Sequence, residues 1–418
     1  MNGAADDGHR IHPALRGGPV YLDYNATTPV DPRVTEAMLP HLTGYFGNPS
    51  SGHLYGAEPR RALAGARTEV AVLVGAEPGE IVFTASGSEA DLLATRGAVL
   101  ASGAPRPHVV TQVTEHPAIL ESCRVLERLH GARVTVLPVD EEGLVDPAAL
   151  GAALTHETVL VSVMAANNET GTLQPVAELA ALAHEFGALF HCDAAQAVGK
   201  IPIDVKALGV DLLTVVGHKM YAPKGVAALY VREGVRLEPV TYGGGQENGL
   251  RAGTENVALA VALGTAARLA ATELAAGSWE RLTALRDDLH RRLDTGLPGR
   301  VRLNGPARQR LPNTLNLGIE GVLGHELLDA VPEIAASTGS ACHEGTRTPS
   351  PALTAMGLPD DRASGALRLS LGRWTTEEDI AIAATALVRA ATAYPEAPDT
   401  PVAVRASTPA SPPRPDPA

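Results

Sequence analysis

Lys219 and Asp193 are the two residues whose types and positions first suggest chemistry. Lys219 follows the apolar run "LLTVVG" that begins at Leu212, and Asp193 lies in "ALFHCDAA", which begins at Ala188. Short apolar runs are typical of buried strands, and open α/β sheets bind ligands at the carboxyl ends of their strands. We therefore predict that an amine and a carboxylate face one crevice. Either residue alone is more often a surface, turn or cap residue.

This pair of residues fits pyridoxal phosphate. That cofactor needs a lysine for a covalent Schiff base, an acid to keep its pyridine nitrogen protonated, and a site for its phosphate. The segment "TASGSEADLL" places Ser86, Gly87 and Ser88 between a predicted strand and a predicted helix. Free backbone N–H groups and the helix dipole favour an anion at such a position, although the turn alone is weak support.

The composition limits the class of protein. The chain has 418 residues, of which 45% are hydrophobic and 19% are charged, which is enough for two domains and a large core. The formal net charge of -13 argues against nucleic acid or an anionic membrane as the main partner. We find no signal peptide and no apolar run of the roughly 18 residues that a membrane helix needs.

The cysteines favour a reducing, cytoplasmic compartment. Cys123, Cys192 and Cys342 are too few and too scattered for a disulfide framework, and no two form a CxxC pair. A zinc site built from Cys342, His343, His191 and Cys192 lacks the usual ligand spacing, so we predict no metal.

Apolar runs and helical patterns alternate through the first two thirds of the chain. Strands are predicted to begin at Ile81, His108, Arg133, Thr158, Ala188 and Leu212. Helices are predicted at 59–74, 88–101, 116–130 and 175–186. This alternation is typical of βαβ units in a largely parallel sheet that is covered on both faces.

The pattern changes after about residue 270, where long helices replace the βαβ alternation. These helices are predicted at 277–294 and 375–393, with short strands around 313–319 and 366–370. We predict four segments: a disordered 1–19, a large cofactor-binding domain over 20–270, a smaller α+β domain over 271–394, and a disordered, Pro- and Ala-rich 395–418. The first residues of the large domain are expected to join the small one.

A series of motifs extends over most of the chain. In order they are "YLDYNATTPVDPRV", "FGNPSSGHLYG", "TEHPAIL", "AANNETGTLQPV", "HCDAAQAVGK", "GHKMYAPKG", "YGGGQENGLRAGTEN", "TGSAC" and "LRLSLGR". With them the chain resembles the cysteine desulfurases of the class V aminotransferase family, from about Val20 to Leu387. The resemblance implies the α/β fold type I of the pyridoxal-phosphate-dependent aminotransferases. It also implies a homodimer with the cofactor at the subunit boundary.

The resemblance assigns roles around the cofactor ring. Lys219 would form the Schiff base and, once released, move a proton between substrate and cofactor. Asp193 would pair with the pyridinium nitrogen, and Gln196 would hydrogen-bond the phenolic oxygen. His116 of "TEHP" would stack on the ring and could act as an acid or base, although a lone histidine before a helix is commonly a cap.

The resemblance also assigns the phosphate and substrate contacts. Ser88, His218 and, from the second subunit, Thr254 would hold the phosphate. Arg368 offers a planar fork for the substrate carboxylate, with Asn168 beside it. Arg368 lies 26 residues after Cys342, a spacing that matches the family pattern.

Cys342 is the residue that separates desulfuration from ordinary transamination. It lies in "STGSACHEGTRTPSP", which is rich in Gly, Ser and Thr and lacks apolar periodicity, so we predict an exposed loop. The resemblance implies that its thiolate takes sulfur from L-cysteine, leaving a persulfide on the enzyme and releasing L-alanine. A protein or a small thiol would then accept the sulfur, for iron–sulfur clusters, thiolated nucleosides or a sulfur metabolite. Cys123 and Cys192 are expected to be buried packing residues.

Some positions depart from the commonest family pattern. Val216 stands where many members have a serine that binds phosphate, and Ser86, Leu92 and Ala222 are also atypical. At the valine before "GHK" the chain also resembles the selenocysteine lyases. Those enzymes share the fold and cleave a carbon–selenium bond. Two alternatives to a cysteine desulfurase therefore stay open, namely a selenocysteine lyase and a catalytically degenerate scaffold subunit. The presence of all the expected catalytic residue types argues against the scaffold.

Overall fold

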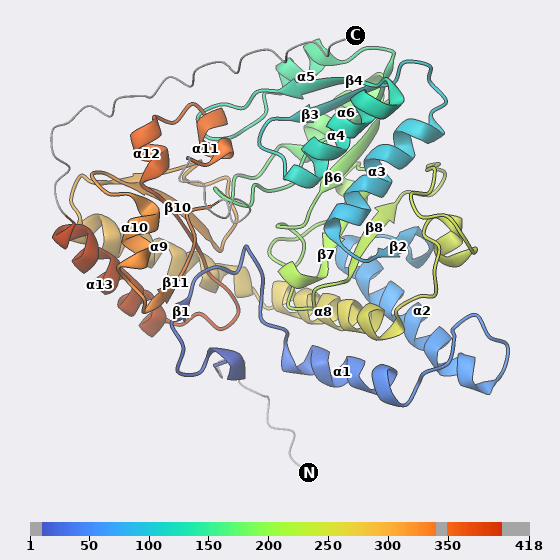
Figure 1. Ribbon diagram of the computed structural model, residues 1–418, viewed down its shortest axis with the longest axis horizontal. Helices are drawn as coiled ribbons and strands as arrows, with labels where there is room; N and C mark the ends of the chain where they lie inside the picture. Colours follow the sequence, from blue (N-terminus) through green and yellow to red (C-terminus); the bar gives the residue numbers. More distant parts are fainter. Residues whose placement is uncertain (1–10, 340–348, 395–418) are drawn as a thin grey trace, which may run out of the picture.

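A computed structural model describes residues 11–339 and 349–394 of the chain. Figure 1 shows a larger body built around one long sheet and a smaller body built around a short sheet. The expectation for residues 395–418 lies outside the described residues. Part of the segment 1–19 is described, and it contains a 3-10 helix at Pro13–Leu15. His12 precedes that helix, is 8% exposed and hydrogen-bonds the Val30 carbonyl at 2.9 Å.

The larger body contains a seven-stranded sheet. In spatial order its strands are β2 (Ile81–Thr84), β8 (Ala227–Val231), β7 (Leu212–Val216), β6 (Leu189–Asp193), β5 (Thr158–Ser162), β3 (His108–Gln112) and β4 (Arg133–Leu137). All neighbours are parallel except β8, which runs antiparallel to both β2 and β7. The six predicted strands are all present. The sequence analysis did not predict β8, which follows β7 after a short connection.

Helices cover both faces of this sheet. In chain order they are α1 (Pro32–Thr43), α2 (Leu54–Val74), α3 (Gly87–Ala101), α4 (Pro117–His130), α5 (Pro147–Ala153), α6 (Val176–Glu185), α7 (Val205–Leu208) and α8 (Val257–Ala275). Alternate strand residues pack on opposite faces: Leu213 and Val215 join the core that contains α2, α6 and α8, whereas Leu212 joins the core that contains α3 and α4. Because both faces are covered, the central strands are apolar throughout, as the sequence indicated.

Side-chain caps fix where two helices of the larger body begin. Ser86 precedes α3, and its hydroxyl accepts the Glu89 N–H at 3.1 Å. His116 precedes α4, whose first residue is Pro117, and its Nδ1 accepts the Ala118 N–H at 3.2 Å. These caps satisfy backbone donors that have no partner inside the helix. The predicted helix 59–74 begins one turn earlier, at Leu54, and accommodates Pro59 inside it.

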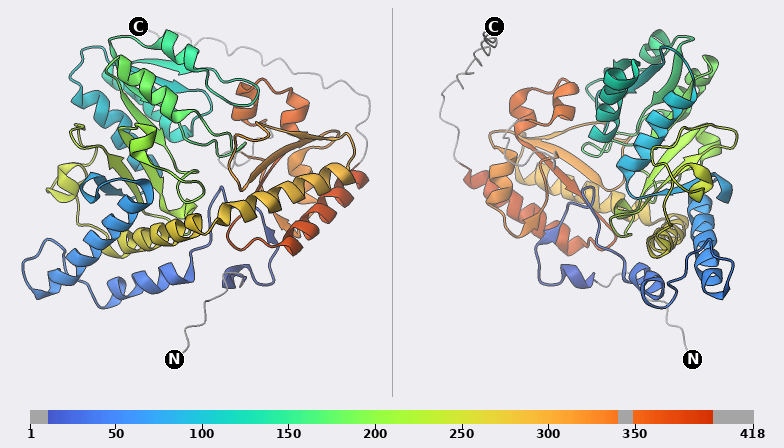
Figure 2. Two further views of the ribbon diagram at one scale, coloured as in Figure 1. Left: turned by 180° about the vertical axis from the view of Figure 1, so that it is seen from behind. Right: turned by 45° about the vertical axis from the view of Figure 1, so that its right-hand side comes forward.

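The smaller body has its own sheet and core. Its sheet has the order β12 (Ala366–Ser370), β10 (Thr314–Ile319), β9 (Val301–Leu303), and β12 and β9 both run antiparallel to β10. Helices α9 (Ser278–Gly296) and α13 (Glu377–Ala393) lie side by side against it, as Figure 2 shows. The short helices α10 (Gly324–Asp329), α11 (Pro351–Ala355) and α12 (Asp360–Ser364) complete this body.

The amino-terminal residues pack with the smaller body. Strand β1 (Val20–Tyr21) pairs with β11 (Ile334–Ala335), and Leu22 is buried in the same core as α9 and α13. The chain then returns to the larger body, because the Thr28 N–H donates to the His218 carbonyl at 3.0 Å. The residues that link the two bodies therefore pass directly beside Lys219. The division at residue 270 stays a prediction.

Among the described residues, α8 alone is long and apolar enough for a membrane span by length and composition. The sequence analysis did not find this segment, because Arg268 and Glu273 interrupt the apolar run. Ten residues of α8 are buried, and the helix packs in the core with α2. A mostly buried helix of this kind is a common feature of protein cores.

Candidate active site

A cavity of about 690 Å³ opens at the carboxyl ends of the parallel strands, between the two bodies. This volume is typical of a site for a small molecule. Its lining includes eight of the predicted site residues: Ser88, His116, Asn168, Asp193, Gln196, His218, Lys219 and Arg368. They come from both bodies and from segments up to 280 residues apart in the chain, so only the fold brings them together.

Backbone carbonyl groups of the amino-terminal segment hold the amine of Lys219. Lys219 ends a short 3-10 helix, Gly217–Lys219, that follows β7. Its Nζ donates to the carbonyl oxygens of Asn25 and Ala26, both at 2.7 Å. Gly217 is required here, because a Cβ would lie 2.8 Å from the Val226 carbonyl oxygen. The strand thus ends in a tight turn that directs the lysine into the cavity.

A group of buried acids forms one wall of the cavity. Asp193 ends β6, is 7% exposed, and its Oδ1 accepts the Ala195 N–H at 2.9 Å. Burial raises the pKa of Asp193, and the hydrogen bond from the Ala195 N–H and the positive charge of Lys219 oppose this effect. Asp91 on α3 and Glu115 before α4 line the same cavity. Burial and the charge of Asp193 raise the pKa of Glu115 to about 8 and that of Asp91 well above its ordinary value.

His116 is both a helix cap and a cavity residue. The sequence analysis weighed a cap against a ring-stacking role, and the two roles are compatible. Burial lowers the pKa of His116, so the imidazole is neutral near pH 7. Because Nδ1 accepts the Ala118 N–H, the ring proton lies on Nε2. The cap therefore fixes both the orientation and the tautomer of the ring.

The first residues of α3 line the part of the cavity where an anion would fit. Gly87, Ser88 and His218 line it. Burial, with a contribution from Lys219, lowers the pKa of His218 to about 4, and its Nδ1 lies 3.2 Å from Thr27 Oγ1. Gly87 packs directly against Val216, since a Cβ on Gly87 would lie 2.7 Å from Val216 Cγ2. The atypical valine therefore supports the turn by packing, where a serine would supply a hydroxyl.

Arg368 lies on β12 in the smaller body and is 2% exposed. Its Nη2 donates to Asp23 Oδ1 at 2.8 Å, and its Nη1 donates to the carbonyl oxygens of Gly339 and Asn168 at 3.1 and 3.3 Å. Its Nε is buried and has no hydrogen-bond partner among the described residues. The side chain is therefore buried in the protein and does not face solvent. A substrate carboxylate would bind at Nε and compete with Asp23 for Nη2.

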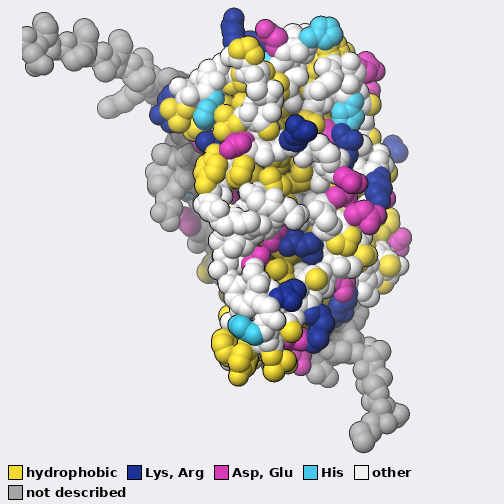
Figure 3. All heavy atoms as spheres, turned by 90° about the vertical axis from the view of Figure 1, so that its right-hand side faces the viewer, with side chains coloured by type: hydrophobic (Ala, Val, Ile, Leu, Met, Phe, Trp, Pro, Cys, Tyr) yellow, Lys and Arg dark blue, Asp and Glu magenta, His cyan; other side chains and the backbone are white. Residues whose placement is uncertain are grey.

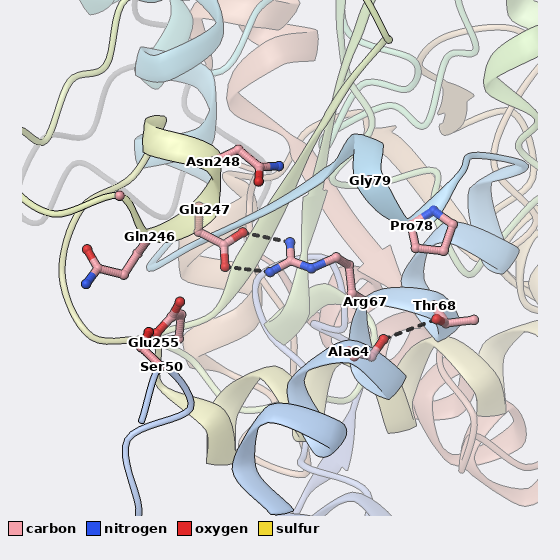
Figure 4. Close-up of a pocket in the computed structure, with 11 residues that line it drawn as sticks. Ser50, Ala64, Arg67, Thr68, Pro78, Gly79, Gln246, Glu247, Asn248 and Glu255 are labelled. Atoms are coloured by element: carbon pink, nitrogen blue, oxygen red, sulfur yellow. Dashed lines mark hydrogen bonds and ion pairs between the residues drawn. The ribbon is translucent and has the colours of Figure 1, made fainter. Parts of the chain in front are cut away.

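Thr254 does not line this cavity. It is exposed on the segment between the 3-10 helix Gln246–Gly249 and α8. That segment borders a second cavity of about 610 Å³, which Ser50 and Glu255 both line (Figure 4). Figure 4 also shows Glu247 facing Arg67, and both guanidinium nitrogens lie 2.7 Å from the carboxylate oxygens. This ion pair fixes the 3-10 helix that precedes the segment on α2 of the same chain.

The structure describes two of the three cysteines. Cys342 lies outside the described residues. Cys123 on α4 and Cys192 on β6 are free and buried, as predicted. Burial raises the pKa of Cys123 to about 12 and that of Cys192 well above its ordinary value, so both stay thiols. Among the described residues, no group of His, Cys, Asp and Glu side chains could hold a metal ion.

Several residues of the site were not assigned by the sequence analysis. Asn25 is 1% exposed and contacts Lys219, Lys200 and Asn168. It belongs to the motif "YLDYNATT", which contributed to the resemblance without receiving a role. Glu115 and Asp91 were also missed. The signal for them was an acid inside an otherwise apolar pattern, which is unusual unless the group has a function.

The cavity fits pyridoxal phosphate. An amine lies among carbonyl oxygens, a buried carboxylate lies on a neighbouring strand end, and a helix amino terminus lines the same cavity. A protonated ring nitrogen beside Asp193 would offset the cost of burying that carboxylate. Lys219, Asp193 and the beginning of α3 are thus the residues that would hold the cofactor.

Comparisons with known proteins agree with this site. The sequence model of the class-V aminotransferase family matches residues 20–382. The chain is 48% identical over 363 residues to a cysteine desulfurase of Trichormus azollae, covering 86% of this chain and 90% of that protein. It is 47% identical over 368 residues to the mitochondrial cysteine desulfurase of Drosophila melanogaster, covering 87% of this chain and 79% of that protein. The chain therefore belongs to the class-V aminotransferase family.

Solved structures show the same fold. A NifS-like protein superposes with a TM-score of 0.82 at 34% identity, covering 89% of this chain and 98% of that one. SspA in complex with cysteine superposes with a TM-score of 0.75 at 34% identity, covering 85% and 99% of the two chains. The predicted aminotransferase-type α/β fold is confirmed.

Proposed function

We propose that this chain acts as a pyridoxal-phosphate-dependent cysteine desulfurase, which takes sulfur from L-cysteine and releases L-alanine. One observation carries the proposal: Lys219, Asp193 and Arg368, from three separate elements, line one cavity in a chain that resembles cysteine desulfurases over most of its length. Bound cofactor would act as an electron sink for the substrate. The selenocysteine and scaffold alternatives become outcomes of the tests below.

Each residue then has a distinct task. Asp193 keeps the ring nitrogen protonated, and Ser88, His218 and the first N–H groups of α3 hold the phosphate. Arg368 and Asn168 orient the substrate carboxylate. The Lys219 amine takes the proton from the substrate α-carbon and returns one during product formation. His116, neutral and fixed by its cap, supports the ring face.

The sulfur transfer is assigned to Cys342. Its thiolate attacks the substrate sulfur, a sulfur–sulfur bond forms, and the substrate carbon–sulfur bond breaks with its electron pair left on the carbon side. Protonation of that carbon gives alanine, and the persulfide passes to a protein acceptor or a small thiol. The buried thiols of Cys123 and Cys192 do not compete, because burial keeps them protonated.

A homodimer would bring Thr254 to a cofactor site. Exposed apolar side chains gather where α1 and α2 meet, at one end of the face shown in Figure 3. They include Phe46 at 73% exposure and Leu54 at 84%. A large exposed apolar patch favours a protein interface. Since Ser50 and Glu255 line one cavity, the patch adjoins the segment of Thr254, which would then reach the partner's phosphate.

The experiment compares alanine release from L-cysteine and L-selenocysteine with a reductant as sulfur acceptor. Fast turnover of cysteine supports the proposal, and turnover confined to selenocysteine would replace it with a selenocysteine lyase. Cofactor-loaded protein that turns over neither substrate would leave the scaffold alternative. Cys342→Ala is expected to keep the cofactor and lose alanine release, with Cys123→Ala as its control.

A cytoplasmic location follows from the requirement for reduced thiols.

A further inference from the structure

Lys200 is a basic residue of the site to which neither the motifs nor the proposed reaction gives a role. It lies in the turn after β6, seven residues beyond Asp193. Its Nζ donates to Gln196 Oε1 at 2.6 Å and to Asn25 Oδ1 at 3.0 Å. Gln196 is 5% exposed and lines the cavity. The amine of Lys200 is therefore fixed behind a cavity residue.

The backbone of the turn places this amine. Gly199 has φ +78°, a conformation that favours glycine, and a Cβ there would lie 2.8 Å from Met220 Cγ. The Lys200 N–H also donates to the Ala197 carbonyl at 3.0 Å. Since Met220 follows Lys219 directly, the turn packs against the residue next to the reactive lysine.

The contact with Lys200 determines which way the Gln196 amide points. The Lys200 amine donates to Gln196 Oε1, so the amide oxygen faces Lys200. The amide nitrogen then donates to the Asn25 carbonyl oxygen at 3.0 Å, and its second N–H is the one it can present to the cavity. Asn25 is itself fixed, since its Oδ1 also accepts from Asn313 at 3.1 Å and its carbonyl also accepts from Lys219.

The charged groups around Lys200 are mainly cationic. Burial, with the charges of Lys219 and Arg368, lowers the pKa of Lys200 well below its ordinary value. Asp23 pairs with Arg368, and the positive charge of Lys200 in turn helps to lower the pKa of His218. Lys200 Nζ donates to two oxygen acceptors, and a neutral amine keeps two N–H groups for them.

We propose that Lys200 is a positioning residue that fixes the Gln196 amide with an N–H toward the ring oxygen of the cofactor. This inference rests on the proposed function and extends it to a residue outside the cavity lining. A neutral hydrogen-bond donor at position 200 should preserve the orientation of the Gln196 amide. An apolar side chain of similar length should lose that orientation.

The test measures the visible absorbance of bound pyridoxal phosphate against pH in purified holoenzyme. Lys200→Met should keep full cofactor stoichiometry and shift the titration midpoint by about one pH unit, because the ring oxygen loses an oriented donor. Lys200→Gln, which can still donate to the same oxygens, should restore the midpoint to within about half a unit. The control is Lys206→Met, since that lysine is 63% exposed and lies on α7.

A double-mutant cycle makes the test specific for Gln196. Gln196→Met should shift the midpoint in the same direction as Lys200→Met, and the double variant should shift it no further. Additive shifts, a wild-type midpoint in Lys200→Met, or a Lys200→Gln shift as large as that of Lys200→Met would each overturn the inference. Wild-type protein that binds no cofactor would instead overturn the proposed function. Should Lys200→Met not fold, Lys200→Ala, which leaves room for water, replaces it throughout.

Discussion

The two walls of the cavity differ in charge. One wall, formed by α3, the residues before α4, and β6, contributes the acids Asp91, Glu115 and Asp193. The other wall surrounds Asn25 and contributes the cations Lys219 and Arg368, with Lys200 behind them. On the cationic wall Arg368 pairs with Asp23, whereas on the acidic wall the charge of Asp193 raises the pKa of both Asp91 and Glu115.

The difference in charge between the two walls indicates which kind of ligand would fit the cavity. Burial raises the pKa of the Asp193 carboxyl and lowers that of the Lys200 amine, so burial disfavours the charged form of each of these two groups. A ligand with a cationic nitrogen at one end and anionic oxygens at the other would stabilise the charged form of both walls. Pyridoxal phosphate carrying an amino acid has this distribution of charge.

The largest effect is expected from Lys219→Ala on the cationic wall. Removing the amine removes the covalent attachment and the proton transfer, so turnover should fall by about 10³-fold or more. Alanine release measures this loss. Lys224→Ala is the matched control, because Lys224 lines the same cavity and is exposed. Equal activities of the two variants would contradict the assignment.

On the acidic wall, Asp193→Asn should weaken cofactor binding by on the order of 10² to 10³-fold, since the buried ring nitrogen loses its charged partner. Asp91→Asn serves as the comparison. The Asp91 carboxyl accepts the Thr214 hydroxyl at 2.8 Å and is assigned no contact with the ring nitrogen, so the substitution should change affinity only slightly. Cofactor titration followed by fluorescence measures both. A larger loss in Asp91→Asn would reverse the proposed roles of the two acids.

Arg368→Lys should affect the substrate more than the cofactor. A lysine cannot reproduce the planar fork, so KM for cysteine should rise by about 10 to 100-fold, with a smaller change in kcat. Steady-state kinetics separate the two parameters. Arg302→Lys on strand β9 of the same sheet is the control, since that side chain is 47% exposed. An unchanged KM would show that the carboxylate binds elsewhere.

The smallest effect concerns Glu115 and the pH dependence of stability. Its pKa is raised to about 8 in the folded protein, so the folded state keeps a proton that the unfolded state releases. The stabilisation of the folded state that this proton provides is fully present below the ordinary carboxyl pKa. It is lost as pH rises through about 8.

The Tm of cofactor-free protein should therefore fall between about pH 5.5 and pH 8.5 by some 2 °C more in wild type than in Glu115→Gln. Thermal unfolding monitored by circular dichroism checks this. Glu121→Gln, at an exposed position on α4, should behave as wild type. Parallel pH profiles in all three proteins would mean that Glu115 is already ionised in the fold.

Local patterns predicted much of the fold and the chemically reactive side chains. Apolar runs ending at Asp193 and before Lys219 located two strand ends, and the strand-end rule placed both residues at one cavity. The sequence did not predict that Asn25, which is 168 or more residues from Lys219 and Asp193 in the chain, contacts Lys219. Such contacts depend on how the amino-terminal segment returns from the smaller body.

Two further features could not be predicted for physical reasons. The buried state of Asp91 follows from its position on the sheet-facing side of α3, and its partner Thr214 is 123 residues away. Thr254 was assigned to the phosphate through the resemblance, and within one chain it lies away from the cavity. Its role depends on a second subunit, so a single sequence or a single chain cannot test it.

The most direct measurement is the identity of the residue that carries the cofactor. Purified protein loaded with pyridoxal phosphate would be reduced with borohydride, digested, and mapped by peptide mass spectrometry. The account predicts one pyridoxyl group per chain, on the peptide that contains Lys219. A label on Lys200 or Lys224, or protein that takes up no label, would contradict it.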